Sequence, residues 1–567
     1  MRKLLAKMGI QYQEYIPKSV ICLREGYTRQ FFFNDLIAGA TVGIIALPLA
    51  MAFAIGSGVS PERGLFTAIV AGFMISLLGG SRVQIGGPTG AFVVIVYSIV
   101  ERHGYEGLAI ATLMAGCILV LMGIARFGVL LRFVPFPVIT GFTTGIALVI
   151  FSSQMKDFFG LCFETVPADF VEKWILYAKN MHTCAPWAAA IAFGTLGLIF
   201  GLRWLYPKLS GAIAAIFLAT FLAWYFDLPV ETIEKKFGGI PRTLPIPCMP
   251  AVTFEKIQSL FPDALTIALL GAIESLLSAR VADGMIGGRH RSNCELVAQG
   301  LANIGSVFFG GIPATGAIAR TSANIKMGAK TPIAGMLHAL TLLLLMLLFA
   351  PLAAKIPLAA LAAVLVFVAW NMSELDHFAD ILKGPLSDVL VLLITFFLTV
   401  LIDLTVAVQV GVLLAALLFL KHMSDKTTLK ACQIVLEDDV KKMGENQDSD
   451  LILRKDVPAG VSIFEINGPF FFGVADLLNE EFRQLAALPK ILILRMRKVT
   501  IIDATGIQAL KQFHQKCQKE GILFLLSGVK EELAPILRQS SVEETLGPQH
   551  LFPCLDDALA FCREKFG

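Results

Sequence analysis

The feature that most constrains this chain is a succession of apolar stretches, each about as long as a membrane is thick. A helix needs roughly 20 apolar residues to cross the hydrocarbon core of a bilayer. Of 567 residues, 56% are hydrophobic and only 16% are charged, whereas about 25% of the residues of a soluble domain are charged. Lipid is therefore the expected solvent for most of the chain. Candidate spans lie at about residues 32–57, 63–80, 105–125, 133–154, 185–203, 208–226, 262–284, 294–310, 331–350, 356–372, 386–402 and 405–423.

Two further apolar segments, Gly90–Val100 and Gly316–Ile325, are too short to cross a membrane. The sequence GGPTGA at 86–91 precedes the first, and it recurs in reduced form as GIPATGA at 311–317. Counting these segments as half-helices gives about fourteen elements, about seven in each copy of the repeat. An odd number turns the second copy upside down. The sequence thus predicts a polytopic α-helical membrane protein with a 7+7 inverted repeat and two half-helices.

Such a pair of half-helices has a specific chemistry. A backbone that breaks at membrane depth must line a cavity or be buried in protein, because lipid cannot satisfy its amides. A helix that begins there points free N–H groups and its positive dipole end into the cavity. We therefore predict an anion site, although glycines that only permit close helix packing would give the same pattern. The predicted donors are the backbone amides of Gly90, Ala91, Phe92, Gly316, Ala317 and Ile318.

Ionisable residues within apolar stretches suggest how binding is coupled to an ion. Glu274 lies inside a predicted span, where a carboxylate costs about 2.5–3.5 kcal/mol or more. Burial favours its neutral form, so Glu274 is a candidate proton carrier, with Ser278 one turn later on the same face. The alternative is a protonated Glu274 in a structural hydrogen bond. Arg320, one turn into the second half-helix, would either complement the anion or pair with Glu274.

Pro48 interrupts the first predicted span. A kink at this position would turn Pro48 and Leu49 toward the same cavity, although neighbouring helices can also satisfy an incidental kink.

Charge and pattern divide the chain into regions. Residues 1–30 are basic and are expected to form a cytoplasmic segment, because no apolar stretch begins before about Phe31. Residues 31–425 form the transport domain, and Lys and Arg are concentrated in alternate short loops, which predicts that both termini are cytoplasmic at the cell (inner) membrane. Residues 426–457 read as a linker with an early strand. In residues 458–567, strands alternate with amphipathic helices, which indicates a soluble α/β domain.

Three segments resemble a known family. Residues 38–54 are similar to the first span of SulP sulfate permeases, and residues 309–321 to their tenth. The sequence IIDATG at 501–506 resembles the strand-to-helix turn of a STAS domain. The resemblance implies core and gate domains, elevator-like transport and often a homodimer. It also implies that substrates come from among sulfate, bicarbonate, chloride and dicarboxylates.

The same resemblance bears on individual residues. Glu274 and Ser278 match positions where sodium-coupled bicarbonate members carry Asp and a hydroxyl, but Ile318 stands where those members supply a further hydroxyl. Ala319 stands where some animal chloride-type members have Ser. Ile318, together with Glu in place of Asp at position 274, argues against sodium and favours proton coupling, whereas Ala319 argues against chloride exchange. Thr505 matches the phosphorylated Ser or Thr of single-domain STAS relatives, which makes it a candidate regulatory site.

The leading hypothesis is therefore proton-coupled symport of an oxyanion such as sulfate, or of a dicarboxylate. A sodium–bicarbonate symporter is the alternative, and a non-transporting membrane motor or scaffold for the STAS domain is a hypothesis of another class. No nucleophile–base motif or metal-ligand spacing suggests an enzyme, a metal or a cofactor. A net charge of +3 argues against nucleic acid. The STAS domain is expected to support folding or dimerisation, or to bind a regulatory partner.

Overall fold

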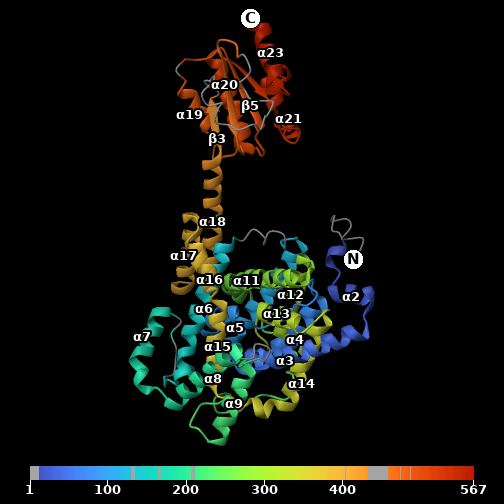
Figure 1. Ribbon diagram of the computed structural model, residues 1–567, viewed down its shortest axis with the longest axis vertical. Coiled ribbons are helices and arrows are strands. Elements are labelled where there is room, and N and C mark those ends of the chain that lie inside the picture. Colours follow the sequence, from blue (N-terminus) through green and yellow to red (C-terminus); the bar gives the residue numbers. More distant parts are fainter. Residues whose placement is uncertain are drawn as a thin grey trace. The chain divides into compact units, whose positions relative to one another are not determined.

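A computed structural model describes residues 12–128, 135–163, 167, 169–205, 211–402, 404–431, 457–472, 474–485 and 487–566. The chain divides into two units, Met1–Ala415 and Ala416–Gly567. Helices make up almost all of the first unit (Figure 1), as a backbone surrounded by lipid requires.

Nine helices in the described ranges are long and apolar enough to cross a membrane, and α9 and α17 are shorter apolar helices. This result confirms the predicted polytopic helical architecture. The helices of the first half are α2 (Lys18–Gly26), α3 (Arg29–Gly56), α4 (Pro61–Leu78), α5 (Gly90–Ile124), α6 (Phe136–Phe159), α7 (Phe170–Asn180), α8 (Pro186–Leu205), α9 (Gly211–Tyr225) and α10 (Ile233–Phe237). Those of the second half are α11 (Phe254–Ile286), α12 (Ser292–Phe308), α13 (Ile318–Lys326), α14 (Ile333–Ala353), α15 (Leu358–Met372), α16 (Leu375–Leu382), α17 (Leu386–Leu401) and α18 (Leu404–Lys426).

The two half-helices are present. Gly104 has φ +65° and ψ −176°, a conformation outside the helical region, so it divides α5 into the predicted half-helix and the following span. The second half-helix is α13. The helix α11 begins at Phe254, earlier than the predicted start near residue 262, because Thr253 caps it and Pro262 is accommodated inside it.

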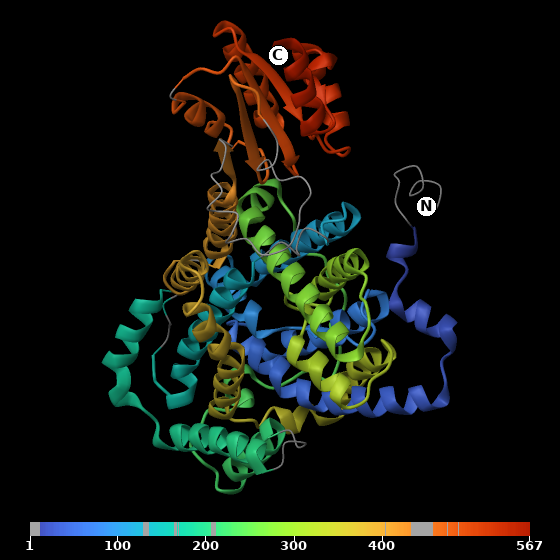
Figure 2. The same ribbon diagram turned by 45° about the horizontal axis from the view of Figure 1, so that its top comes forward.

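Helices from the two halves of the chain lie side by side. The helix α3 packs against α14, and α5 packs against α11 and α12 (Figure 2). In contrast, α6 packs against α15 and α17. The helices thus form two groups, each of which combines segments that are distant in the sequence.

Two aspartates, Asp35, which is buried, and Asp263, which is partly buried, connect helices of one half to the other. Asp35 on α3 accepts hydrogen bonds from the backbone N–H of Lys330 (2.7 Å) and of Thr331 (3.2 Å), which immediately precede α14. Asp263 on α11, 228 positions later, forms an ion pair of 2.9 Å with Arg102 beside the break in α5. Each aspartate therefore lies on the helix that opens one half and holds a helix of the other half.

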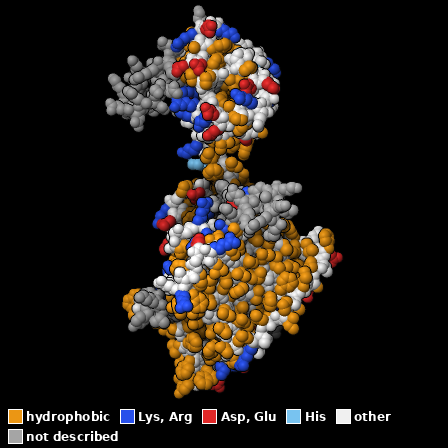
Figure 3. Space-filling view, turned by 90° about the vertical axis from the view of Figure 1, so that its right-hand side faces the viewer, with side chains coloured by type: hydrophobic (Ala, Val, Ile, Leu, Met, Phe, Trp, Pro, Cys, Tyr) orange, Lys and Arg blue, Asp and Glu red, His pale blue; other side chains and the backbone are white. Residues whose placement is uncertain are grey.

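Lipid is the expected surrounding of the first unit. Hydrophobic side chains cover most of the face of this unit that Figure 3 shows, and charged side chains gather toward its edges. Large apolar side chains such as Trp224, Leu348 and Phe397 are more than half exposed. A soluble surface rarely carries so large an apolar patch.

The second unit contains the predicted α/β domain. Its sheet has the order β3-β4-β5-β6-β7, with β3 antiparallel to β4 and the other pairs parallel. Alternate residues of β5 face opposite sides: Leu492 and Leu494 join one buried cluster, whereas Ile491 and Ile493 join another under α23. Because both faces are covered, the first four residues of the strand, Ile491–Leu494, are all apolar. The strands are β3 (Thr428–Ala431), β4 (Val461–Asn467), β5 (Ile491–Lys498), β6 (Leu523–Ser527) and β7 (Leu551–Phe552), and the helices are α19 (Leu477–Arg483), α20 (Ala504–Lys519), α21 (Ala534–Gln539), α22 (Val542–Leu546) and α23 (Leu555–Phe566).

Candidate functional site

The two glycine–proline motifs meet in space. The short strand β1 (Gly86–Gly87) pairs antiparallel with β2 (Thr315–Gly316), with Gly86 opposite Gly316. A Cβ on Gly316 would lie 1.6 Å from Nε2 of Gln84, so a larger residue there would displace this buried side chain from its hydrogen bonds to Ser275. This pairing brings together the starts of α5 and α13, Gly90 and Ile318, which are 228 positions apart in the sequence.

Side chains of neighbouring helices satisfy the broken backbone around Pro313. Asn303 donates a hydrogen bond to the carbonyl of Ala314 and accepts one from its N–H, each 2.8 Å long. The hydroxyl of Thr67 accepts a bond of 2.7 Å from the N–H of Ile312, and Ser306 donates one of 2.8 Å to its carbonyl. The N–H and carbonyl groups of Ile312 and Ala314 are thus all paired within the protein.

The polar residues on α12 that support this loop form a stripe that the sequence reasoning missed. Glu295, Gln299, Asn303 and Ser306 recur at intervals of three or four and are all buried. Residues at this spacing lie on one face of a helix, so the stripe could have been predicted from the sequence. The Glu295 carboxylate accepts hydrogen bonds from the backbone N–H of Gly80, from Ser275 and from Gln299.

Some predicted amide donors are engaged in the structure. The N–H of Phe92 bonds to the carbonyl of Thr89, and that of Ala317 bonds to the carbonyl of Ile85. Gly316 belongs to the β1–β2 pair. The remaining predicted donors, Gly90, Ala91 and Ile318, lie in the first turns of α5 and α13, where helix geometry provides no intrahelical partner for the amide.

Glu274 and Ser278 of α11 contact different half-helices. The Thr89 hydroxyl, at the N-cap of α5, donates a hydrogen bond of 2.8 Å to Oε2 of Glu274. Ser278, one turn later, lies 3.2 Å from the hydroxyl of Thr321 on α13. A third contact joins Thr315 Oγ1 to the carbonyl of Gly271 at 2.9 Å. One face of α11 therefore holds the starts of both half-helices.

Arg320 crosses from the second half-helix to the first motif. Its Nη2 donates to the carbonyl of Pro88, and no ion pair joins it to Glu274 in the described part of the chain. The side chain is only 4% exposed, and its Nη1 has no hydrogen-bond partner among the described residues. An unpartnered buried guanidinium nitrogen is costly, and an anion between the half-helices would supply the missing acceptor.

Apolar side chains face this site. A Cβ on Gly90 would lie 2.9 Å from Sδ of Met372 and 3.5 Å from Ile150 and from Phe53. Met372 and Ile150 belong to α15 and α6, which pack against each other. The sequence reasoning did not identify these residues, because nothing in their local pattern distinguishes them from lipid-facing ones.

The two residues predicted to line the anion cavity have different surroundings. Pro48 is in the wall of an apolar cavity of about 570 Å³ formed with side chains of α9 and α14. Leu49 packs against the main buried cluster of the first unit. Their contribution to an anion path stays a prediction.

Comparison with known proteins defines the family. Residues 32–395 match the sulfate permease family, and residues 453–558 match the STAS domain. The chain belongs to the sulfate permease family. It is an integral membrane anion transporter, and the family consists of transporters and not enzymes.

Relatives extend over nearly the whole of this sulfate permease family member. It is 42% identical over 535 residues to the Bacillus subtilis (strain 168) protein YvdB, covering 94% of this chain and 98% of that protein. It is 32% identical over 462 residues to the bicarbonate transporter BicA of Picosynechococcus, covering 79% of this chain and 80% of that protein. The fold matches that of murine Slc26a9 in the inward-facing state with a TM-score of 0.85 at 20% identity, covering 97% of this chain and 94% of that one.

The STAS domain carries the last predicted site residue. Asp503 caps α20: its Oδ1 accepts a hydrogen bond of 2.8 Å from the N–H of Gly506, and its Oδ2 accepts one of 3.1 Å from the N–H of Phe472. Thr505, in the first turn of α20, is exposed. Its modification stays a prediction.

Proposed function

We propose that this transporter carries a small anion, sulfate, another oxyanion or a dicarboxylate, together with a proton. The observation that carries the proposal is the link between Glu274 and Thr89 at the start of the first half-helix. Arg320 reaches the same place from the second half-helix. An ionisable acid thus lies beside an electropositive site, where its charge controls anion binding.

The coupling follows from electrostatics. The amides of Gly90, Ala91 and Ile318 and the free Nη1 of Arg320 would hold the anion. When Glu274 is ionised it repels that anion, and when it is protonated the repulsion is lost. Proton and anion therefore favour each other's binding, as reciprocal linkage requires.

An elevator-like movement would carry the anion and the proton across the membrane. The bound site lies on the group formed by α3, α5 and α11–α14, whereas α6, α15 and α17 form a second group. The half-helix start faces apolar side chains of that second group, which supports sliding of one group past the other. The symmetric Asp35 and Asp263 contacts support the 7+7 inverted repeat.

Two further features belong to the proposal. The chain would lie in the cell membrane with both termini cytoplasmic, according to the distribution of Lys and Arg in its short loops. It would function as a homodimer, with the STAS domain available to a regulatory partner.

Sodium-coupled bicarbonate uptake is the second candidate, because BicA is a relative at 32% identity. In this chain the hydroxyls of Ser278 and Thr321 face each other across α11 and α13. However, Ile318 places an apolar side chain at the start of α13, where a sodium site would need another oxygen.

Transport measured in proteoliposomes distinguishes proton-coupled anion uptake from sodium-coupled bicarbonate uptake. Purified protein is reconstituted, and uptake of labelled sulfate, bicarbonate and succinate is measured under an inward proton gradient, under an inward sodium gradient and with neither. We expect the proton gradient alone to drive accumulation of sulfate or succinate, with protein-free liposomes as control. Accumulation of bicarbonate that needs sodium and ignores the proton gradient would establish the second candidate instead.

A further inference from the structure

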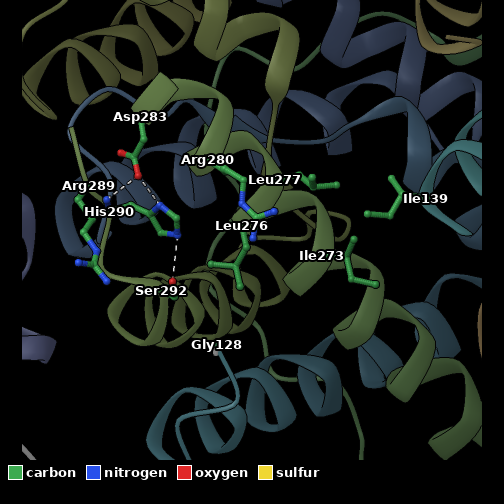
Figure 4. A pocket seen from close by; sticks show the side chains of 10 residues that line it. All are labelled: Gly128, Ile139, Ile273, Leu276, Leu277, Arg280, Asp283, Arg289, His290 and Ser292. Atoms are coloured by element: carbon green, nitrogen blue, oxygen red, sulfur yellow. Dashed lines mark hydrogen bonds and ion pairs between the residues drawn. The ribbon is translucent and has the colours of Figure 1, made fainter. Parts of the chain in front are cut away.

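A second cavity, of about 350 Å³, lies where α11 ends and α12 begins (Figure 4). Its polar wall consists of Arg280, Asp283, Arg289, His290 and Ser292, and apolar residues of α11 and α6 complete it. Its lining does not include the half-helix residues, Glu274 or Arg320.

The cations of this cavity outnumber its one acidic group. Asp283 is engaged by His290: its Oδ2 accepts hydrogen bonds from the backbone N–H of that residue at 2.8 Å and from its Nδ1 at 2.7 Å. The Nε2 of His290 lies 3.0 Å from Oγ of Ser292. Arg280 and Arg289, in contrast, have no hydrogen bond or ion pair among the described residues. Two guanidinium groups are therefore available to a ligand.

The backbone adds to this positive character. The turn after α11 passes through Gly287, whose φ of +67° closes the helix. The two hydrogen bonds from His290 to Asp283 hold this turn, in which Arg289 lies. The helix α12 begins at Ser292 without a side-chain cap, so its positive dipole end opens at the cavity wall.

We propose that this cavity is a second anion site, which takes a tetrahedral oxyanion such as sulfate or phosphate, either as a free ion or as a lipid headgroup. Guanidinium groups match this geometry because their N–H groups form a planar fork. Arg291, beside the cavity, donates a hydrogen bond of 2.8 Å to the carbonyl of Ile16. The site therefore lies at the same end of the first unit as the N-terminal segment, the cytoplasmic end in the proposed orientation.

The site would hold an anion at the inner mouth of the transporter. Ile273 and Leu277, in its apolar wall, directly precede Glu274 and Ser278 on α11. An anion in this cavity would thus contact the helix that also supports both half-helices. The proposal concerns equilibrium binding, and it goes beyond the proposed coupling mechanism.

Chemical protection tests the site on the unaltered full-length protein. The purified protein is treated with phenylglyoxal, which modifies arginine, and modification of each arginine is measured by peptide mass spectrometry. We expect inorganic sulfate to slow the modification of Arg280 and Arg289 several-fold but not that of Arg242, an exposed arginine far away in the sequence. Slower modification in phosphatidylglycerol nanodiscs than in phosphatidylcholine nanodiscs, without sulfate, would identify a lipid headgroup as the ligand. Modification rates of Arg280 and Arg289 that neither sulfate nor phosphatidylglycerol changes would overturn the proposal.

Variants provide a second measurement. We expect Arg280→Gln and Arg289→Gln each to weaken equilibrium binding of labelled sulfate at this site about tenfold. Lys326→Gln, which removes an exposed cation at the end of α13, should leave it unchanged. Gel filtration and melting temperature verify that each variant folds. Because no gradient is applied, loss of proton-driven uptake alone would leave these results unaffected, and unchanged sulfate binding in both arginine variants would refute the site.

Discussion

Replacement of Glu274 by glutamine tests the coupling mechanism most directly. The substitution removes the charge but keeps the size and a hydrogen-bonding carbonyl for Thr89. Oε2 of Glu274 lies 2.8 Å from the hydroxyl of Thr89, which occupies the N-cap position of α5. An anion bound to the first amides of α5 would lie about one more hydrogen bond away, ~3 Å, so the two charges would be ~6 Å apart.

This separation sets the size of the repulsion between the two charges. At an effective dielectric constant of about 20, two unit charges ~6 Å apart repel each other by about 2.8 kcal/mol. This energy corresponds to about a hundredfold change in anion affinity. The wild-type protein should therefore bind its anion about a hundredfold more tightly when Glu274 is protonated. In Glu274→Gln, affinity should be high and independent of pH.

The assay combines binding with flux. In proteoliposomes, Glu274→Gln should lose accumulation driven by a proton gradient but retain exchange of internal for external anion. Glu101→Gln is the matched control, because Glu101 is exposed at the far end of the first half-helix; it should behave as wild type. Full proton-driven accumulation by Glu274→Gln would refute the coupling role, and equal loss in both variants would point to general damage.

Three further predictions concern stability and fit. Asn303→Ala should lower stability by about 3 kcal/mol, measured as thermal unfolding in detergent, because it leaves both polar groups of buried Ala314 without their 2.8 Å partners. Gly316→Ala should abolish transport, since its Cβ would meet a glutamine amide at 1.6 Å, whereas Gly284→Ala, with open space around it, should be neutral in the same flux assay. In the STAS domain, burial lowers the pKa of His514. Neutral His514 therefore stabilises the fold above about pH 6.5, and that stability is lost as the pH falls; proteolysis of the full-length protein at pH 7.5 and 5.5 should show this loss, and His514→Gln should remove it.

Much of the architecture could be predicted from the sequence because the bilayer imposes simple rules on helix length and backbone hydrogen bonding. Span length, the broken segments at Gly90 and Gly316, and the strand–helix alternation of the tail all follow from hydropathy and spacing. The helix α7 was not predicted, since it lies between the spans expected at about 133–154 and 185–203. Its signal was local: Asp169 accepts hydrogen bonds from the N–H groups of Val171 and Glu172 as an N-cap.

The site was predicted in part, for a physical reason. The cost of a charge in lipid points to Glu274 from sequence alone, but which half-helix it contacts depends on helix rotation. The sequence allowed two roles for Arg320, binding of the anion or pairing with Glu274. Neither role included its hydrogen bond to the Pro88 carbonyl. Glu295 was not predicted because it lies near a polar loop, where a carboxylate is ordinarily exposed to water. In the structure it is completely buried.

The aspartate contacts between the two halves have a consequence for biosynthesis. Asp35 reaches its partner Lys330 across 295 residues. At about 5–20 residues per second, a ribosome needs about 15–60 s to make that stretch. During this interval Asp35 lacks the backbone N–H groups from which it accepts hydrogen bonds in the finished fold, so α3 must wait at the membrane surface or be sheltered by insertion machinery. Chains truncated before α14 should therefore be recognised as unassembled and degraded.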